Sequence, residues 1–469
     1  MLRTRSLIRL TAAAALAALP PLALSDGLNV VEAMKHRDVA SVRASIAEGA
    51  DVNAQDAETA TALHWAAHWN DIEAVRLLLG AGADPNASNR FGVTPLHEAA
   101  IVRNAAMMAA MLEAGGDPNA AFGEGESVLM TAARTGNAEI VRMILEHGGD
   151  ATAAESWHGQ TALMWAALDG HPDVARLLIE HGADPNRAST AHDWISIEYS
   201  SGNVPKTRDI GGLTPLHFAA RHGRIEVADV LLEAGADSTA VEPMYQLTPL
   251  QTSIVNGHYA FAAHLIDRGA DVNDGSLYLT IDTRHLGFYA QRPNPPDKDR
   301  GVSNLDVVDL LLARGADADH PYDKGIPERT VAGQIEVPPG ATPLDRAAAA
   351  NDLEVIRRLV AQGADAGVAT EDGTTPLMLL TGFKRSAFGP PPQVAGDAAR
   401  YEAIGRLLEA GADVNAAQVE SGNTAVHYAA MRGAGNVVAL LTEHGASLDI
   451  ENAEGMTAAG LAADAAAGE

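Results

Sequence analysis

The apolar positions of this chain recur with a helical period in short blocks. In one block they fall at Ile72, Val75, Leu78 and Leu79, which places them on a single helix face. Gly82 follows as a stop that tolerates positive φ. The pattern predicts an amphipathic helix that ends at a glycine, followed by a turn.

Each unit is predicted to open with a shorter helix, and the third unit shows why. Thr94 can cap that helix through its hydroxyl, and Pro95 takes the first helical position, where no N–H is needed. Leu96, Ala99 and Ala100 share one face, and the alanines let neighbouring helices approach closely. A unit is therefore helix, turn, helix and an extended finger. Because one such pair cannot bury its apolar face alone, the units must stack.

Two markers repeat in phase along most of the chain. The triplet Gly-Ala-Asp starts at Gly49, Gly82, Gly182, Gly235, Gly269, Gly315, Gly363 and Gly411, with close variants at Gly115, Gly148 and Gly445. The tetrad Thr-Pro-Leu-His, or a variant of it, starts at Thr61, Thr94, Thr161, Thr214, Thr248, Thr342, Thr375 and Thr424. The commonest spacing is 33 residues. With this period and the signature T-P-L-H-x-A, the chain resembles the ankyrin-repeat family.

The resemblance implies an all-α, ankyrin-repeat solenoid of helix-turn-helix units with β-turn fingers. About eleven repeats and a closing half-repeat would form one domain over residues 26–469. Residues 28–59 would be the N-terminal capping repeat and residues 453–469 the C-terminal cap, because terminal repeats need a polar outer face. The resemblance also implies that the tetrad histidines make structural hydrogen bonds.

The first 25 residues differ from the rest and are predicted to be a Sec-type signal peptide. Arg3, Arg5 and Arg9 form a basic start, and an apolar run of alanine and leucine follows over residues 10–19. Small residues precede Asp26, the expected first residue of the mature chain. We therefore expect a periplasmic or secreted protein with no membrane insertion after the signal is cleaved.

Excess spacing between markers locates four insertions, near residues 188–210, 287–303, 318–340 and 382–398. The first and third lengthen fingers, and the other two separate the helices of one unit. They hold aromatic, proline and lysine residues, so they either add contacts for a partner or are loops that drifted on a tolerant scaffold. Both interpretations stay open.

Aromatic residues recur on the fingers and on the first helices, at the x of T-P-L-H-x-A. In proteins of the family that the chain resembles, these parts line the face that grips other proteins, and buried aromatics commonly anchor such interfaces. The alternative is that the first-helix aromatics pack between repeats. The candidate partner-binding residues are Trp65, Phe91, Phe122, Trp157, Trp165, Trp194, Tyr199, Phe218 and Tyr245.

Composition narrows the chemistry. The chain has 61 acidic and 33 basic residues, a net charge of −28, which argues against a nucleic-acid binder but permits steering of a basic protein partner. It has no cysteine, so disulfides and thiolate metal sites are excluded. Its 17 histidines sit mostly at repeat positions without metal-ligand spacing, and no cofactor motif is found.

The sequence favours an exported scaffold that binds another protein, of unknown identity, without catalysis. A second hypothesis is a hydrolase or carbohydrate-processing site on the inserted loops, for which His192, Asp193 and Glu198 are the available acid–base groups. A third is buffering of multivalent cations by the acidic surface.

Overall fold

The structure is a computed structural model that describes residues 29–191, 211–284, 301–324, 337–382 and 397–467. The predicted signal peptide and most of the four predicted insertions lie outside these ranges. Contacts divide the chain into two units. Unit 1 comprises Met1–Ala132 and Arg142–Gly149, and unit 2 comprises Ala133–Val141 and Asp150–Glu469.

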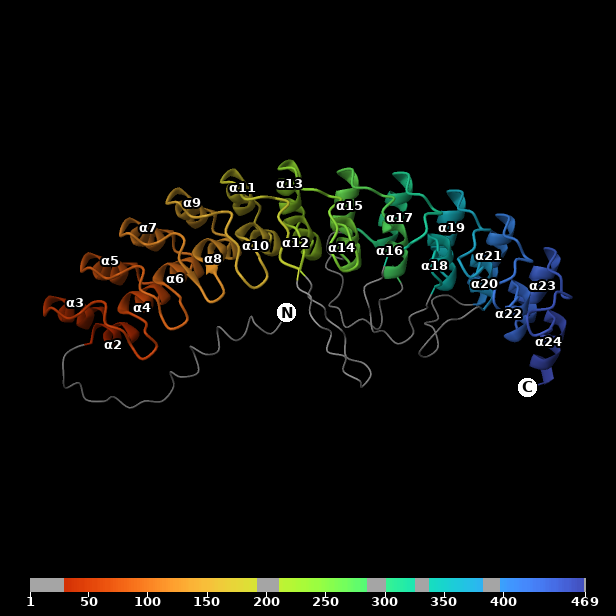
Figure 1. Ribbon diagram of the computed structural model, residues 1–469, viewed down its shortest axis with the longest axis horizontal. Helices are drawn as coiled ribbons and strands as arrows, with labels where there is room; N and C mark the ends of the chain where they lie inside the picture. The colour runs from red at the N-terminus through yellow and green to blue at the C-terminus, as the bar shows by residue number, and fades with distance from the viewer. Residues whose placement is uncertain (1–28, 192–210, 285–300, 325–336, 383–396, 468–469) are drawn as a thin grey trace. The chain divides into compact units, whose positions relative to one another are not determined.

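Unit 1 is built from helix pairs (Figure 1). Its helices are α2 (Val30–Lys35), α3 (Val39–Ala47), α4 (Ala62–His68), α5 (Ile72–Gly80), α6 (Pro95–Ile101) and α7 (Ala105–Glu113). A short antiparallel hairpin follows, in which β1 (Ala121–Phe122) pairs with β2 (Glu126–Ser127). First helix α4 packs against α2 and α6, and second helix α5 packs against α7. The next pair, α8 (Val128–Thr135) and α9 (Ala138–Glu146), has residues in both units.

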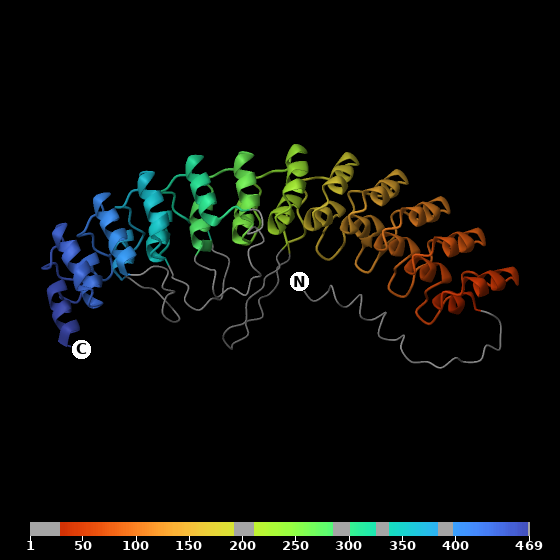
Figure 2. The ribbon, with the colours of Figure 1, turned by 180° about the vertical axis from the view of Figure 1, so that it is seen from behind.

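Unit 2 continues the same pattern, and Figure 2 shows its helix pairs from behind. Its helices are α10 (Ala162–Asp169), α11 (Pro172–Glu180), α12 (Pro215–His222), α13 (Ile225–Glu233), α14 (Pro249–Val255), α15 (Tyr259–Asp267), α16 (Ser276–Arg284), α17 (Asn304–Ala313), α18 (Pro343–Ala349), α19 (Leu353–Ala361), α20 (Pro376–Thr381), α21 (Asp397–Glu409), α22 (Ala425–Met431), α23 (Gly435–Glu443) and α24 (Ala458–Ala467). From α10 to α24 each first helix packs against the next first helix. Within the described residues, helix pairs followed by the single closing helix α24 confirm the predicted all-α repeat fold.

Three tetrad histidines, His64, His217 and His427, tie their first helices to the following repeat, as the resemblance implies. The Thr61 N–H donates to His64 Nδ1 at 3.1 Å, which leaves the ring proton on Nε2. That Nε2 lies 2.9 Å from the Val93 carbonyl oxygen in the next repeat and donates to it. Burial lowers the pKa of His64, and it lowers the pKa of His97 to about 4. These imidazoles are therefore neutral structural parts at neutral pH.

Asparagine side chains join the bases of successive fingers. In unit 1, Asn53 Nδ2 donates to the Gly82 carbonyl at 3.2 Å, and Asn53 Oδ1 accepts from the Asp84 N–H at 2.8 Å. Asn186 makes the same two bonds in unit 2, to the Gly235 carbonyl at 3.0 Å and from the Asp237 N–H at 2.7 Å. Each asparagine amide thus pairs with a carbonyl and an N–H at the helix end of the neighbouring repeat, where backbone groups lack partners within the helix.

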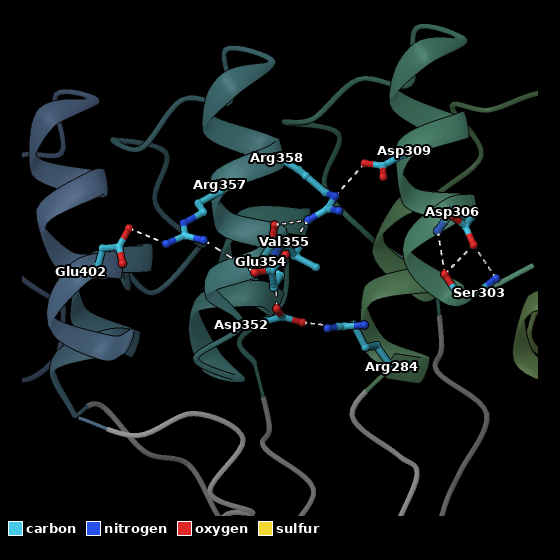
Figure 3. Close-up of polar contacts among 10 residues, drawn as sticks. All are labelled: Arg284, Ser303, Asp306, Asp309, Asp352, Glu354, Val355, Arg357, Arg358 and Glu402. Carbon is cyan, nitrogen blue, oxygen red and sulfur yellow. Dashed lines mark hydrogen bonds and ion pairs between the residues drawn. The ribbon is translucent and has the colours of Figure 1, made fainter. Parts of the chain in front are cut away.

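Ion pairs join the second helices of unit 2 from one repeat to the next (Figure 3). Arg358 on α19 lies 2.7 Å from Asp309 on α17, and Arg357 lies 2.6 Å from Glu402 on α21. These pairs are solvent-exposed, so each contributes little stability. The acidic helix residues are therefore partly neutralised by arginines of adjacent repeats.

The first predicted insertion leaves and re-enters a finger at one place. The Ser189 N–H donates to the Leu213 carbonyl at 2.9 Å, and the Gly212 N–H donates to the Ser189 carbonyl at 3.1 Å. The segment from residue 192 to residue 210 is thus inserted between two hydrogen-bonded ends. The repeat fold continues past it from Thr214.

Candidate functional site

Phe91 stands at the tip of a finger in unit 1, and its side chain is 60% exposed. Asn89 holds the tip, because its Oδ1 accepts from the Phe91 N–H at 2.9 Å and from the Val93 N–H at 3.1 Å. The Arg90 guanidinium lies 4.7 Å from the centroid of the Phe91 ring and also pairs with Glu58 on the preceding finger. The ring is therefore presented to solvent by a loop of fixed backbone.

Trp157 occupies the equivalent position on a finger of unit 2 and is 45% exposed. The loop is closed by the buried carboxylate of Glu155, which accepts from the backbone N–H groups of Trp157 at 2.7 Å, His158 at 2.9 Å and Gln160 at 2.8 Å. Carboxylate-to-amide bonds of this kind are stronger than neutral ones. Trp157 is thus an exposed indole on a preorganised tip.

Tyr245 shares this loop design but is half-buried. Glu242 is buried, and its carboxylate accepts from the N–H groups of Met244 at 2.7 Å and Tyr245 at 2.8 Å. The adjoining Val241 is 43% exposed. This finger therefore presents less aromatic and more aliphatic surface than the Trp157 finger.

Trp65 on α4 belongs to a polar and aromatic cluster in unit 1. Its Nε1 donates to Asp56 Oδ2 at 3.0 Å, and the Lys35 ammonium lies 5.6 Å from its ring centroid. Lys35 and Asp56 are 3.0 Å apart. Burial alone would raise the pKa of Asp56, but hydrogen bonds from Lys35, the backbone and Trp65 lower it. The half-buried indole stacks on Trp69, with ring centroids 6.3 Å apart.

The remaining candidates are less accessible. Phe122 is half-buried and meets the His97 ring edge-on, with centroids 4.9 Å apart. Phe218 is only 5% exposed, so it packs inside unit 2 and offers a partner little surface. Trp165 is half-buried on α10 beneath the Arg134 guanidinium, 5.4 Å from its ring centroid. Trp194 and Tyr199 lie outside the described residues, as do the acid–base groups of the alternative enzymatic hypothesis.

Several surface residues were not anticipated from the sequence. Trp69, the residue that caps the C-terminus of α4, lies four residues after Trp65 and extends its face, a spacing that the sequence shows. The anchors Asn89 and Glu155 lie two residues before the exposed ring, another visible pattern. Val419, at a finger of unit 2, is 73% exposed.

The described residues were also searched for other kinds of site. No group of three or more histidine, aspartate or glutamate side chains among them is arranged to hold a metal ion. None of the helices in the described ranges is long and apolar enough to cross a membrane. A hollow of about 280 Å³ in unit 2 is lined by Thr248, Asp274 and Lys324, among others, and burial raises the pKa of Asp274.

Comparison with known proteins finds the same repeat over several stretches of the chain. Family models match as "Ankyrin repeats (3 copies)" at residues 30–122 and 107–189, "Ankyrin repeats (many copies)" at 163–232 and 394–442, and "Ankyrin repeat" at 340–371. Together these matches span more than half of the chain.

Individual relatives match shorter stretches. The chain is 31% identical to ankyrin repeat protein nuc-2 of Neurospora crassa over 26% of its own length and 10% of that protein. It is 27% identical to an ankyrin repeat protein of Rickettsia felis over 27% of its length and 52% of that protein. It is also 27% identical to ankyrin repeat and SOCS box protein 3 of Bos taurus, over 29% of its length and 23% of that protein. The chain therefore spans about half or less of these relatives.

Proposed function

The chain belongs to the ankyrin-repeat family, and from that premise we propose that it is a scaffold that binds another protein through its fingertips, without catalysing a reaction. Ankyrin repeats typically mediate protein–protein interactions. The finer proposal is that Phe91 in unit 1 and Trp157 in unit 2 are contact residues for the partner.

The observation that carries this proposal is the exposure of two large aromatic rings on loops whose backbone is already ordered. Phe91 is 60% and Trp157 45% exposed, whereas most apolar side chains of the described repeats are buried. Exposed aromatics on rigid loops lose little conformational entropy when a partner covers them, so they make efficient anchors. Neither ring is needed to fill the core of its unit.

The charge of the chain supports a partner with a basic surface. A net charge of −28 creates a negative potential that accelerates encounter with positively charged proteins and slows encounter with acidic ones. Added salt screens this electrostatic attraction, but it does not weaken the apolar contacts that Phe91 and Trp157 would make with a partner. Partner binding should therefore show a salt-dependent association rate and a dissociation rate controlled by the aromatic tips.

Export through a signal peptide at residues 1–25 is also part of the proposal. It is supported by the arginine-rich start, the short apolar run and the small residues before Asp26. N-terminal sequencing of the chain recovered from a bacterial periplasm tests it. A mature chain that begins at Asp26, in the periplasm or in the medium, supports export, and a chain found only inside the cell with residues 1–25 intact rejects it.

The binding proposal is tested by capture from periplasmic extract with four baits: the mature chain and its Phe91→Ala, Trp157→Ala and Tyr401→Ala variants. Tyr401 is the matched control, because it is an exposed aromatic (39%) on α21 rather than on a finger. We expect one protein retained in stoichiometric amount. Loss of a true anchor costs at least about 2 kcal/mol, or roughly 30-fold in affinity.

The comparison between variants decides the outcome. Weaker binding by Phe91→Ala or Trp157→Ala, with the Tyr401→Ala bait unchanged, supports fingertip binding and shows which unit contributes. Equal binding by all four baits rejects the fingertips as the contact surface. No retained protein from a folded bait rejects the scaffold proposal itself.

A further inference from the structure

A side-chain donor joins the first helix of several repeats to the next finger. In unit 1 the donor is His64, whose acceptor is the Val93 carbonyl. In unit 2, His217 Nε2 lies 3.1 Å from the Leu247 carbonyl, and Gln251 Nε2 donates to the Asp274 carbonyl at 2.6 Å. Each acceptor belongs to the residue just before the capping residue of the next first helix. The position therefore requires a group that carries a proton.

Asp345 occupies this position on α18. Its Oδ2 accepts from the Thr342 N–H and hydroxyl, both at 2.9 Å, just as His64 Nδ1 faces Thr61. The side chain is completely buried, and its Oδ1 has no hydrogen-bond partner. The residue equivalent to Val93 is Thr374. Its carbonyl oxygen already accepts from the Thr370 N–H at 2.9 Å and from the Thr370 hydroxyl at 3.1 Å, and the group left to accept from Asp345 is the buried Thr374 hydroxyl. An ionised carboxylate has no proton to offer this finger.

We propose that Asp345 is a proton-binding site: its carboxyl group carries a proton on Oδ1 and donates it to the finger formed by residues 370–374, and this contact opens when the proton leaves. A carboxylic acid is isoelectronic with an amide, so the protonated side chain offers one donor and one acceptor, as Gln251 does. The carboxyl group would then satisfy two buried groups that the ionised form leaves unpaired.

The surroundings favour the proton near neutral pH. The pKa of Asp345 is raised to about 7. Burial is the largest cause and repulsion from Asp372 on the finger adds to it, whereas the hydrogen bonds from Thr342 act in the opposite direction. On the α16 side lie Tyr278, which is uncharged at neutral pH, and the buried ion pair between Asp282 and Arg346, 2.8 Å apart.

On the other helices that pack on α18, charged side chains are either paired or absent; on α19, Glu354 pairs with Arg357 and Arg358. The N-cap of α19, Asp352, is neutralised by Arg284 at 2.6 Å, and α20 contains no titratable residue. Asp372 is therefore the principal charge that a deprotonated Asp345 would meet. A deprotonated Asp345 would be repelled by the half-buried Asp372 carboxylate, and the finger is the part able to move.

The finger also connects to the next repeat, so its opening has consequences beyond Asp345. The Val419 N–H donates to the Asp372 carbonyl at 2.9 Å, which links the two fingers. Val419 is 73% exposed. Above neutral pH the loosened finger at 370–374 would release this link and reshape an exposed part of unit 2. This inference rests on the fold and does not depend on the proposed function.

The test is hydrogen exchange of the full chain between pH 5.5 and 8.5, corrected for intrinsic exchange, in the wild type and in Asp345→Asn. The asparagine keeps an N–H donor at every pH and is nearly isosteric. We expect protection of residues 370–374 in the wild type to fall about tenfold per pH unit as the pH rises to about 7, because there each opening releases one proton, and to level off above that pH, where Asp345 is already ionised. In Asp345→Asn this protection should not change with pH. The finger at residues 89–93, held by His64, whose pKa is lowered by burial, is the internal control.

Parallel pH profiles in the wild type and Asp345→Asn would overturn the proposal. If Asp345→Asn does not fold, Asp345→His, which restores the residue used in other repeats, replaces it. Infrared detection of the protonated carboxyl band in the wild type needs no variant. A band that disappears near pH 7 supports the proposal, and its absence already at pH 5 refutes it.

Discussion

Replacing Glu155 by alanine should loosen the Trp157 finger without disturbing the helices around it. The carboxylate is buried and accepts three backbone N–H groups between 2.7 and 2.9 Å. A net contribution of about 0.5–1.5 kcal/mol for each bond gives roughly 2–4 kcal/mol for the three together. The free energy of opening the loop should fall by that amount.

The assay is hydrogen exchange of residues 156–160, because repeat arrays open locally and a global melt would miss a change confined to one finger. A loss of 2–4 kcal/mol corresponds to protection lowered by a factor of roughly 30 to several hundred. Glu155→Gln keeps one acceptor and should fall between the wild type and Glu155→Ala. Glu420→Ala, at an exposed glutamate on another finger of unit 2, is the matched control.

The variant also separates loop order from the indole itself. Glu155→Ala retains Trp157, so any loss of partner affinity reports the entropy of ordering the tip rather than lost contact area. Equal protection of residues 156–160 in Glu155→Ala and Glu420→Ala would refute the reasoning. The loop would then be stabilised by other contacts, and the Glu155 carboxylate would contribute little to it.

Three further changes test the packing of the repeats. Arg346→Met removes the arginine that pairs with the buried Asp282 carboxylate and should destabilise unit 2 by about 3–5 kcal/mol in urea denaturation, whereas adding Asp282→Leu should recover most of the loss. Burial lowers the pKa of His97 from 6.5 to about 4, so its contribution to the free energy of unfolding is complete above pH 6.5 and falls by up to about 3 kcal/mol as the pH drops toward 4. His97→Gln should remove this acid sensitivity. Identical plots of unfolding free energy against pH for the wild type and His97→Gln would contradict this expectation. Asn186→Ala loses both bonds to the next finger and should lower protection of that finger by about 1–3 kcal/mol, an expectation that unchanged exchange at residues 235–237 would disprove.

The repeat fold was predictable because its causes are local. The caps, the proline at the first helical position and the glycine stops act within a few residues of one another, so Thr94 and Gly82 mark helix boundaries without any knowledge of the tertiary structure. Because the same pattern recurs in each repeat, a signal that is weak in one repeat becomes strong evidence for the fold of the chain. The aromatic fingertips were also visible, because Phe91 and Trp157 recur at one place in the period.

The accessibility of the candidate residues was not predictable from the period. Phe218 and Trp165 occupy the same position in their repeats, yet Phe218 is buried and Trp165 is half-buried. Their exposure depends on what neighbouring repeats place against them. The sequence did not indicate the roles of Glu155 and Asn89, because turn residues of this kind are common. Only the structure shows from which backbone N–H groups their side chains accept hydrogen bonds.

The sequence by itself determined the unit, its boundaries and its stacking, because capping and helical periodicity are short-range effects that each repeat restates. Tertiary structure decided the pairings between residues far apart in the chain. Arg346 and Asp282 are 64 positions apart, and no local pattern announces their ion pair. In the sequence, Asp345 is only the residue that stands where other tetrads have histidine. Its significance comes from burial opposite Asp372 and Thr374, which only the folded chain creates.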